Sequence, residues 1–401
     1  MEWGIQSDHI AIDGNEAWLV DRNENALYKA DLSKDECDLV SMVPTPFSID
    51  KDPLPFYRIN SYCYKKESCI FLMPDRGESI LIYDLDKKKI SRIEINNPFS
   101  VRLSIHDFWE ENGKLWAVSH GLGKILLIDI DKKTIAEYYD IFDNPNILPG
   151  HEAKKVGNCI FNVSRNSNMI CEFNIASKEK KNYEIHGLTE GMYTICYDNT
   201  NFWLSGISGK IYLWDKEKKK ITELNEYPKD LKIYKEEVGK IEEIGFPLEQ
   251  EIPIFYKSFL LGKFVCFLPL NSNQALCNKL LCVNREDFHM ISIALNEEEN
   301  NTTGLYTLEY LKENRIAGIL CERNNLISEF DVNLNIIKKK ILKKKDQTAL
   351  MQKNIALYGM NIEATNLALK EYRKAIQDYE EIELEKKYDF GKLIFDKMGK
   401  K

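Results

Sequence analysis

The chain has 401 residues, of which 44% are hydrophobic and 29% are charged, the composition of an ordinary soluble globular protein. Its 20 Tyr, 18 Phe and 6 Trp exclude an intrinsically disordered chain, which would be poorer in aromatic residues. The formal net charge of −8 argues against nucleic-acid binding, which needs an extended basic surface.

The sequence offers no targeting or membrane segment. No stretch of about 18 uninterrupted apolar residues is present, so we expect no transmembrane helix. The first eight residues contain Glu2 and lack the basic start and apolar core of a secretory signal. We therefore expect a cytoplasmic protein.

The ten cysteines form no C-x-x-C pair, which excludes the local signatures of zinc ribbons and thioredoxin-like sites. Most of them stand inside apolar runs such as 159–161 and 265–267. In a cytosolic chain such cysteines behave as small buried hydrophobic residues, and we expect them to be free and structural.

A repeated pattern runs through the first 215 residues: an apolar stretch with an aromatic residue, a polar turn, and an apolar stretch that closes on Asp or Asn. The aromatic and closing residues are 13 apart in four copies and 12 apart in the fifth: Trp18 and Asp31, Phe71 and Asp84, Trp116 and Asp129, Phe161 and Asn174, Trp203 and Asp215. Short β-like segments flank each copy, which predicts four strands per unit. Weaker sixth and seventh units span about 254–295 and 305–342.

The anchors recur every 42 to 62 residues, near the length of a four-stranded propeller blade. Over about residues 5–342 the chain resembles a seven-bladed β-propeller of four-stranded antiparallel blades, similar to the NHL, WD-repeat and streptogramin-lyase-like groups. Only Trp214-Asp215 matches the WD dipeptide, so no subfamily is indicated. Two stacked β-sandwiches explain the regular repeat less well, and six or eight blades remain alternatives to seven.

Two segments depart from the repeat. Residues 225–253 form a charged insertion between units five and six, either a solvated loop or a lid over the central cavity. From residue 346 the apolar spacing becomes helical, and residues 361–386 predict a long helix in a C-terminal α-helical extension. We expect a propeller over 1–345 and the extension over 346–401, whose helix packs on the rim, docks a protein partner or mediates self-association.

The first hypothesis for function is a binding scaffold. The resemblance implies that the loops between second and third strands share a face with the connections between blades. Residues at equivalent turn positions there, or on an adjoining connection, are Arg22, Arg58, Arg76, His120, Arg165 and Arg323. Such a ring would suit an anionic small molecule, glycan or peptide, because Arg forms bidentate charge-assisted hydrogen bonds. Turns such as Ser164-Arg165-Asn166 are also good turn sequences, in which the Arg only projects into solvent.

The alternative hypothesis is an enzyme. The sequence has no Gly-rich phosphate loop, G-x-S-x-G or H-E-x-x-H motif. Further histidines and carboxylates map to the same face, although chance could place them there: His106, His151, Glu152, His186 and Glu190. A His with a carboxylate can bind a divalent metal or act as general base for a lyase or hydrolase. A separation of about 4–5 Å between His106 and His151 would favour the enzyme; the scaffold needs no cofactor.

Overall fold

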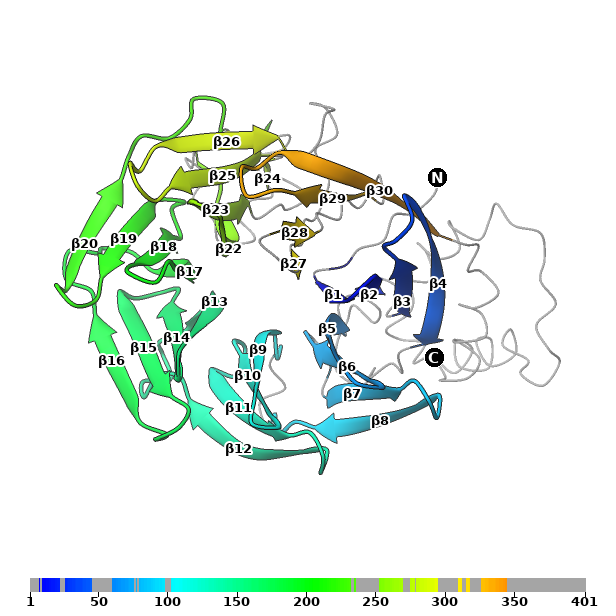
Figure 1. The fold of residues 1–401 in the computed structure, drawn as a ribbon. Coiled ribbons are helices and arrows are strands. Elements are labelled where there is room, and N and C mark those ends of the chain that lie inside the picture. Colours follow the sequence, from blue (N-terminus) through cyan, green and yellow to red (C-terminus); the bar gives the residue numbers. More distant parts are fainter. Residues whose placement is uncertain are drawn as a thin grey trace, which may run out of the picture. The chain divides into compact units, whose positions relative to one another are not determined.

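The structure is a computed structural model. It describes residues 7, 9–21, 26–44, 60–75, 77, 79–97, 102–231, 234–235, 252–269, 275–277, 279–294, 309–311, 315–317 and 326–344. The regular elements of these residues are all β-strands, and they form a β-propeller of four-stranded antiparallel blades (Figure 1). The predicted helix over 361–386 and the boundary at residue 345 lie outside the described residues. Across those same ranges, no helix is long and apolar enough to span a membrane.

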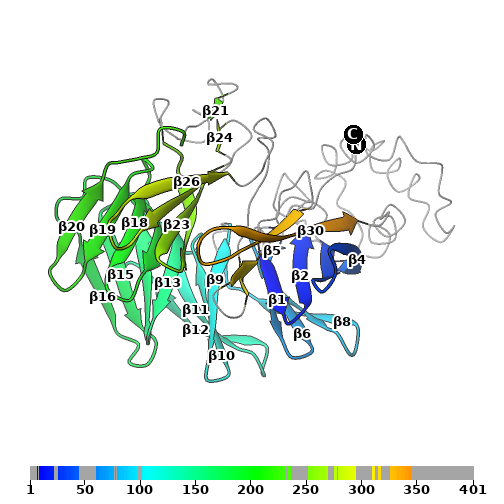
Figure 2. The same cartoon turned by 45° about the horizontal axis from the view of Figure 1, so that its top comes forward.

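The chain divides into two compact units, which we call unit 1 (Met1–Trp3 with Ser104–Lys339) and unit 2 (Gly4–Leu103 with Lys340–Lys401). Four four-stranded sheets of unit 1 follow one another in the chain, and Figure 2 shows them as adjacent layers. Their strands are β9 (Ile105–Glu111), β10 (Lys114–Ser119), β11 (Lys124–Asp129) and β12 (Thr134–Asp140); β13 (Pro149–Val156), β14 (Cys159–Ser164), β15 (Met169–Asn174) and β16 (Lys180–Glu184); β17 (Met192–Tyr197), β18 (Phe202–Gly206), β19 (Ile211–Asp215) and β20 (Lys220–Leu224); and β22 (Phe255–Leu261), β23 (Phe264–Pro269), β25 (Lys279–Asn284) and β26 (Met290–Ala294). The first strands β9, β17 and β22 all contact β13, and β17 also contacts β22.

The remaining strands include a second group of four-stranded meanders. In unit 2 they are β1 (Ile10–Asp13), β2 (Glu16–Asp21), β3 (Ala26–Asp31) and β4 (Glu36–Pro44), then β5 (Asn60–Lys66), β6 (Cys69–Pro74), β7 (Ser79–Asp84) and β8 (Lys89–Glu94). Unit 1 also contains β27 (Glu309–Leu311), β28 (Arg315–Ala317), β29 (Leu326–Phe330) and the start of β30 (Ile336–Lys344).

The prediction of seven blades is wrong: the described strands form six sheets of at least four strands. Five have four strands, and the sixth has eight in the order β1-β2-β3-β4-β30-β29-β28-β27. The reason is a parallel pairing between β4 and β30, in which Ile341 is opposite Glu36 and Leu342 is opposite Cys37. Because this pairing joins strands from opposite ends of the chain, no local sequence pattern predicts it.

The burial of each strand follows its place in the sheet. The second and third strands are almost wholly buried, and all six residues of β7 are inaccessible to solvent or nearly so. The fourth strands β12, β16 and β20 alternate between exposed and half-buried residues. Strands covered on both faces read as continuous apolar runs, which is why the second and third strands gave the clearest sequence signal.

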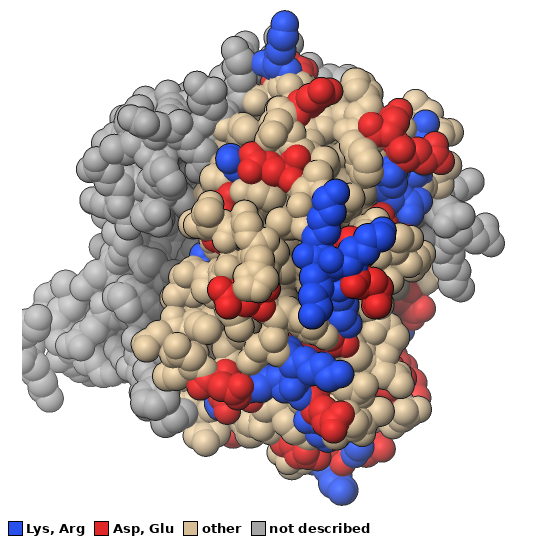
Figure 3. All heavy atoms as spheres, turned by 90° about the vertical axis from the view of Figure 1, so that its left-hand side faces the viewer, with Lys and Arg blue, Asp and Glu red and all other residues tan. Residues whose placement is uncertain are grey.

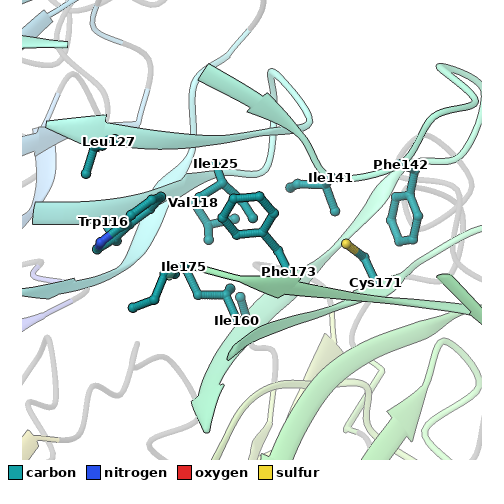
Figure 4. Packing of buried hydrophobic residues seen from close by; sticks show 11 residues of the cluster. Trp116, Val118, Ile125, Leu127, Ile141, Phe142, Ile160, Cys171, Phe173 and Ile175 are labelled. Atoms are coloured by element: carbon teal, nitrogen blue, oxygen red, sulfur yellow. The ribbon is translucent and has the colours of Figure 1, made fainter. Parts of the chain in front are cut away.

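The cores lie between consecutive sheets. One cluster combines Trp116 and Val118 of β10 with Ile160 and Phe173 of the next sheet (Figure 4). The rings of Trp116 and Phe173 lie 5.9 Å apart, a distance typical of favourable aromatic contacts. Two further clusters repeat this arrangement between later sheets of unit 1. Each sheet therefore buries its apolar faces against its neighbours.

The closing Asp or Asn of each repeat caps the turn between the third and fourth strands. The Oδ1 atoms of Asp84, Asp129, Asn174 and Asp215 accept backbone N–H bonds, at 2.9–3.1 Å, from the residue three positions later. Asp and Asn are suited to this because their short side chains bond to nearby backbone amides. The repeated residue is thus explained by local turn chemistry.

Lysines occupy the left-handed position of these turns, where glycine is usual. Lys88, Lys133, Lys178 and Lys219 have φ angles of 52°, 54°, 64° and 52°. The Nζ atom of Lys178 lies 3.9 Å from the centre of the Trp116 ring in the preceding sheet, and burial there lowers its pKa. Cation–π attraction offsets the cost of the unfavourable backbone conformation.

The cysteine prediction is confirmed for the part of the chain that is described. Eight cysteines there are free; Cys69 and Cys159 are half-buried and the other six are buried. Burial raises the pKa of the Cys171 thiol to about 12, so its reactive thiolate form is suppressed at neutral pH.

The first part of the insertion packs against the protein. The Tyr227 hydroxyl accepts a bond from the Ile211 amide at 2.7 Å, and Leu231 is buried in the adjoining core. Further on, β21 (Tyr234–Lys235) pairs with β24 (Ala275–Leu276). Much of the insertion 225–253 lies outside the described residues, so the alternatives of a solvated loop and a lid both stay predictions.

Surface charge on the outer side of unit 1 is mixed. Figure 3 shows lysines beside acidic residues on this face. Ion pairs of unit 1 include Lys180 with Asp143 at 2.5 Å and Lys216 with Glu172 at 2.8 Å.

Replacing Lys178 with Ala is expected to lower the free energy of unfolding by about 0.5–1 kcal/mol, because the Trp116 contact is lost. Chemical denaturation measures this change. The matched control is Lys219→Ala, which removes a lysine with a similar positive φ from the equivalent turn. An equal loss in both variants would contradict a specific contribution of the ring contact.

Candidate functional site

Four consecutive first strands of unit 1 carry a β-bulge near the same end. In β9, β17 and β22 the register shifts at one residue, namely His106, Tyr193 and Tyr256. In β13 the shift lies between Pro149 and Ala153 and includes His151. A bulge changes the direction of a side chain and is common beside functional sites.

The bulged residues meet one another. Ring centres of His106 and His151 lie 4.5 Å apart, and those of His151 and Tyr193 lie 5.3 Å apart with nearly parallel planes. Tyr256 meets His151 edge-on at 5.7 Å, and His120 of the adjoining turn lies 5.5 Å from His106. We call these five side chains the ring cluster. His106, His151 and Tyr193 are half-buried residues.

Gly150 permits the approach of β13 to β17 that the ring cluster needs. A Cβ atom at this position would lie 2.5 Å from the Val163 side chain and 2.9 Å from the Met192 carbonyl oxygen. Both distances are too short for any other residue without movement of the backbone. The glycine before His151 therefore sets the spacing between His151 and Tyr193.

A backbone carbonyl fixes the tautomer of His151. Its Nδ1 atom lies 3.1 Å from the carbonyl oxygen of Tyr256. Because a carbonyl oxygen only accepts, Nδ1 carries the hydrogen in the neutral ring and Nε2 holds the lone pair. In this tautomer Nε2 is the acceptor atom of the His151 ring.

His120 is held by the half-buried Asp107. Its Nε2 lies 3.0 Å from Asp107 Oδ2, which also accepts the Ala153 amide at 2.8 Å. Burial lowers the pKa of His120, against the opposing effect of Asp107. Burial alone would raise the pKa of Asp107, but His120, the Ala153 amide and His106 together hold it below its usual range. The pair therefore consists of a neutral imidazole and a carboxylate near neutral pH.

Glu152 directly follows His151 in β13 and is 5% exposed. Its Oε2 accepts bonds from the Ile195 amide at 3.3 Å, the Ser258 amide at 3.0 Å and the Ser258 hydroxyl at 2.5 Å. Burial raises the pKa of Glu152 to about 8, with a smaller contribution from the charge of Asp107. The carboxyl group is thus largely protonated at neutral pH.

Two residues of the predicted catalytic group lie elsewhere. His186 is exposed on the connection between β16 and β17. Glu190 accepts bonds from the Ser208 amide at 2.8 Å, the Ser208 hydroxyl at 2.7 Å and the Tyr212 hydroxyl at 2.5 Å. These contacts hold the turn between β18 and β19, a structural role for Glu190.

Of the five arginines in the predicted ring, the described residues include Arg165. Arg165 is exposed at the end of β14, and its amide donates to the Leu148 carbonyl at 2.9 Å. Four predicted members, Arg22, Arg58, Arg76 and Arg323, lie outside the described residues. In unit 2, Arg102 forms a bidentate pair with buried Asp75 at 2.6 and 2.7 Å, so its charge is already matched.

The histidine and carboxylate group was a candidate for metal binding. Among the residues that the structure describes, no three or more His, Cys, Asp or Glu side chains are placed to hold a metal ion. The described arrangement is instead one of stacked rings with two hydrogen-bonded carboxyl groups.

Sequence reasoning did not select Tyr193, Tyr256, Asp107 or Ser258. Aligning the first strands of the repeats would have placed both tyrosines at the positions of His106 and His151. Asp107 and Ser258 carry no such signal, because their partners are 13 to 106 residues away in the chain.

Replacing His120 with Gln should reduce the acid sensitivity of the fold. The lowered pKa of folded His120 means that the unfolded chain takes up its proton first as pH falls below about 6.5, so stability is lost there. Thermal unfolding between pH 7 and 5 should show a smaller decrease in the variant. His186→Gln, at an exposed position, is the control and should follow the wild-type profile; identical curves for His120→Gln would refute the assignment.

Comparisons with known proteins support the architecture. The sequence matches no protein-family model and no curated protein. The structure is similar to virginiamycin B lyase from Staphylococcus aureus, with 13% identity over 78% of this chain and 92% of that one and a TM-score of 0.54. A catalytically inactive histidine-to-alanine variant of that lyase with quinupristin shows 14% identity over 80% of this chain and 93% of that one, with a TM-score of 0.53. Kluyveromyces lactis Hsv2 shows 8% identity over 82% of this chain and 93% of that one, with a TM-score of 0.50. At these identities the likeness shows that the chain has the β-propeller fold.

Proposed function

We propose that the protein is a ligand-binding β-propeller and that the ring cluster is its binding site. The observation that carries the proposal is the series of bulges that turns His106, His151, Tyr193 and Tyr256 toward one another. Stacked rings of half-buried residues offer flat surfaces and polar edges to a ligand. Such a site needs no cofactor.

The proposed ligand is anionic: a small molecule, a glycan or a peptide. Arg165 supports this choice because it is exposed at the end of β14, and Ser164 of that strand pairs with Pro149 beside the bulge of β13. The negative charge of Asp107 is already matched by two hydrogen-bond donors. A guanidinium group can bind a carboxylate or phosphate through two parallel hydrogen bonds. The remaining predicted arginines would extend this site beyond the described residues.

Thermal-shift screening with acidic sugars, nucleotides and short acidic peptides tests the proposal. A ligand at about 100 times its dissociation constant adds about 2.7 kcal/mol to folding stability. We expect Arg165→Ala to weaken binding about tenfold and to reduce its salt dependence, and His151→Ala to abolish it. Lys219→Ala removes a distant positive charge and is the control. A ligand that binds His151→Ala and Tyr193→Ala as tightly as the wild type would contradict this site.

A second candidate function is a lyase or hydrolase in which His151 is the general base. The specific observation is the hydrogen bond between its Nδ1 and the Tyr256 carbonyl, which leaves Nε2 as acceptor. The 4.5 Å separation from the His106 ring agrees with the criterion derived from the sequence. A similar propeller structure is a lyase, and its histidine-to-alanine variant is catalytically inactive.

Turnover assays with esters, lactones and quinupristin test the enzymatic candidate. His151→Ala should lower the rate by about 10²- to 10⁴-fold, the usual contribution of a general base, while Lys219→Ala should have no effect. The chemical step is followed by mass spectrometry of the products. Turnover that is unchanged by His151→Ala would exclude this residue as the base.

A further inference from the structure

Glu152 joins three first strands through one oxygen atom. It belongs to β13, and its Oε2 accepts bonds from Ile195 of β17 and from the amide and hydroxyl of Ser258 of β22. The partners are 43 and 106 residues away in the chain. These bonds connect the same three strands that supply His151, Tyr193 and Tyr256 to the ring cluster.

The spacing along each strand relates the two sets of contacts. His151 directly precedes Glu152, Tyr193 is two residues before Ile195, and Tyr256 is two residues before Ser258. The bond at Ile195 therefore fixes the position of Tyr193 relative to β13, and the bonds at Ser258 fix the position of Tyr256 relative to β13. We propose that Glu152 is the positioning residue of the ring cluster and couples its geometry to the gain or loss of one proton.

The surroundings of Glu152 explain why its protonation can change near neutral pH. The charged and titratable groups that act on it are Lys154 of its own strand, Asp107 of β9 and Lys257 of β22, and Cys196 of β17 also faces it. Burial outweighs the lysines and raises the pKa of Glu152 to about 8. Below this pH the neutral carboxyl accepts the three bonds; above it a buried carboxylate accepts them more strongly.

The consequence is a site whose ring contacts change over the range in which Glu152 ionises. Stronger bonds to the carboxylate would draw Ile195 and Ser258 toward β13 and alter the stacking of Tyr193 and Tyr256 on His151. The positioning role stands on the geometry of the strands. Only the step from ring geometry to ligand binding rests on the proposed function.

The test is nuclear magnetic resonance of the full chain with ¹³C-labelled His and Tyr rings, recorded without ligand from pH 6 to 10. Signals of His151 and Tyr193 should shift through a step with a midpoint near pH 8. Glu152→Gln keeps an oxygen acceptor but cannot ionise, so this step should be lost while the signals keep near-wild-type positions at pH 6.

Two further variants make the outcome specific. Ser258→Ala removes a donor that lowers the pKa of Glu152, so the midpoint should move to higher pH. Glu172→Gln changes a hydrogen-bonded carboxylate on β15, which bonds to Tyr183 and Lys216, and should leave the step unchanged. If Glu152→Gln does not fold, the Ser258→Ala shift alone decides the question.

A step that persists in Glu152→Gln, or a midpoint that Ser258→Ala does not raise, would overturn the proposal. So would the absence of any step in the wild type. None of these measurements uses a ligand, so their failure is separate from failure of the ligand screen. A pH step together with a negative screen would retain Glu152 as the positioning residue and reject the proposed ligand site.

Discussion

Each sheet of this protein has two apolar faces, and a single four-stranded sheet cannot bury both of them. The core clusters of unit 1 accordingly lie between consecutive sheets, as the contacts of Trp116 with Phe173 illustrate. Stacking is the only arrangement that removes these side chains from water, since no helix covers a sheet in the described part of the chain. The repeat in the sequence, the burial of second and third strands and the approach of the first strands all follow from this constraint.

Stacked sheets bring their first strands together, and the backbone amides of these strands then need hydrogen-bond acceptors away from water. Backbone amides of the first strands find acceptors on neighbouring first strands. Asp107 accepts the Ala153 amide, and Glu152 accepts the amides of Ile195 and Ser258. The bulges of the same strands turn rings toward one another, so these carboxyl groups connect the strands that carry the candidate site.

The turns contribute to stability across sheets as well as within them. Asn174 caps its own turn, while Lys178 in that turn covers Trp116 of the preceding sheet. Phe288 occupies the corresponding left-handed position two sheets later, at a φ of 61°, and its ring lies 6.0 Å from Trp203. In these two turns a bulky residue at the left-handed position contacts the aromatic residue of the second strand in the preceding sheet.

The sequence by itself determined the repeat, the four-stranded units, the turn residues such as Asp129 and the free cysteines, because these depend on periodicity and on neighbours close in the chain. Tertiary structure decided the rest. The parallel pairing of β4 with β30 reduced the expected seven sheets to six. Contacts between residues up to 106 apart in the chain decided which histidines meet. They also decided that Glu190 holds a turn while Glu152 bridges three strands. Hydrogen bonds and burial between distant strands leave no local pattern, so only the folded arrangement of those strands could supply them.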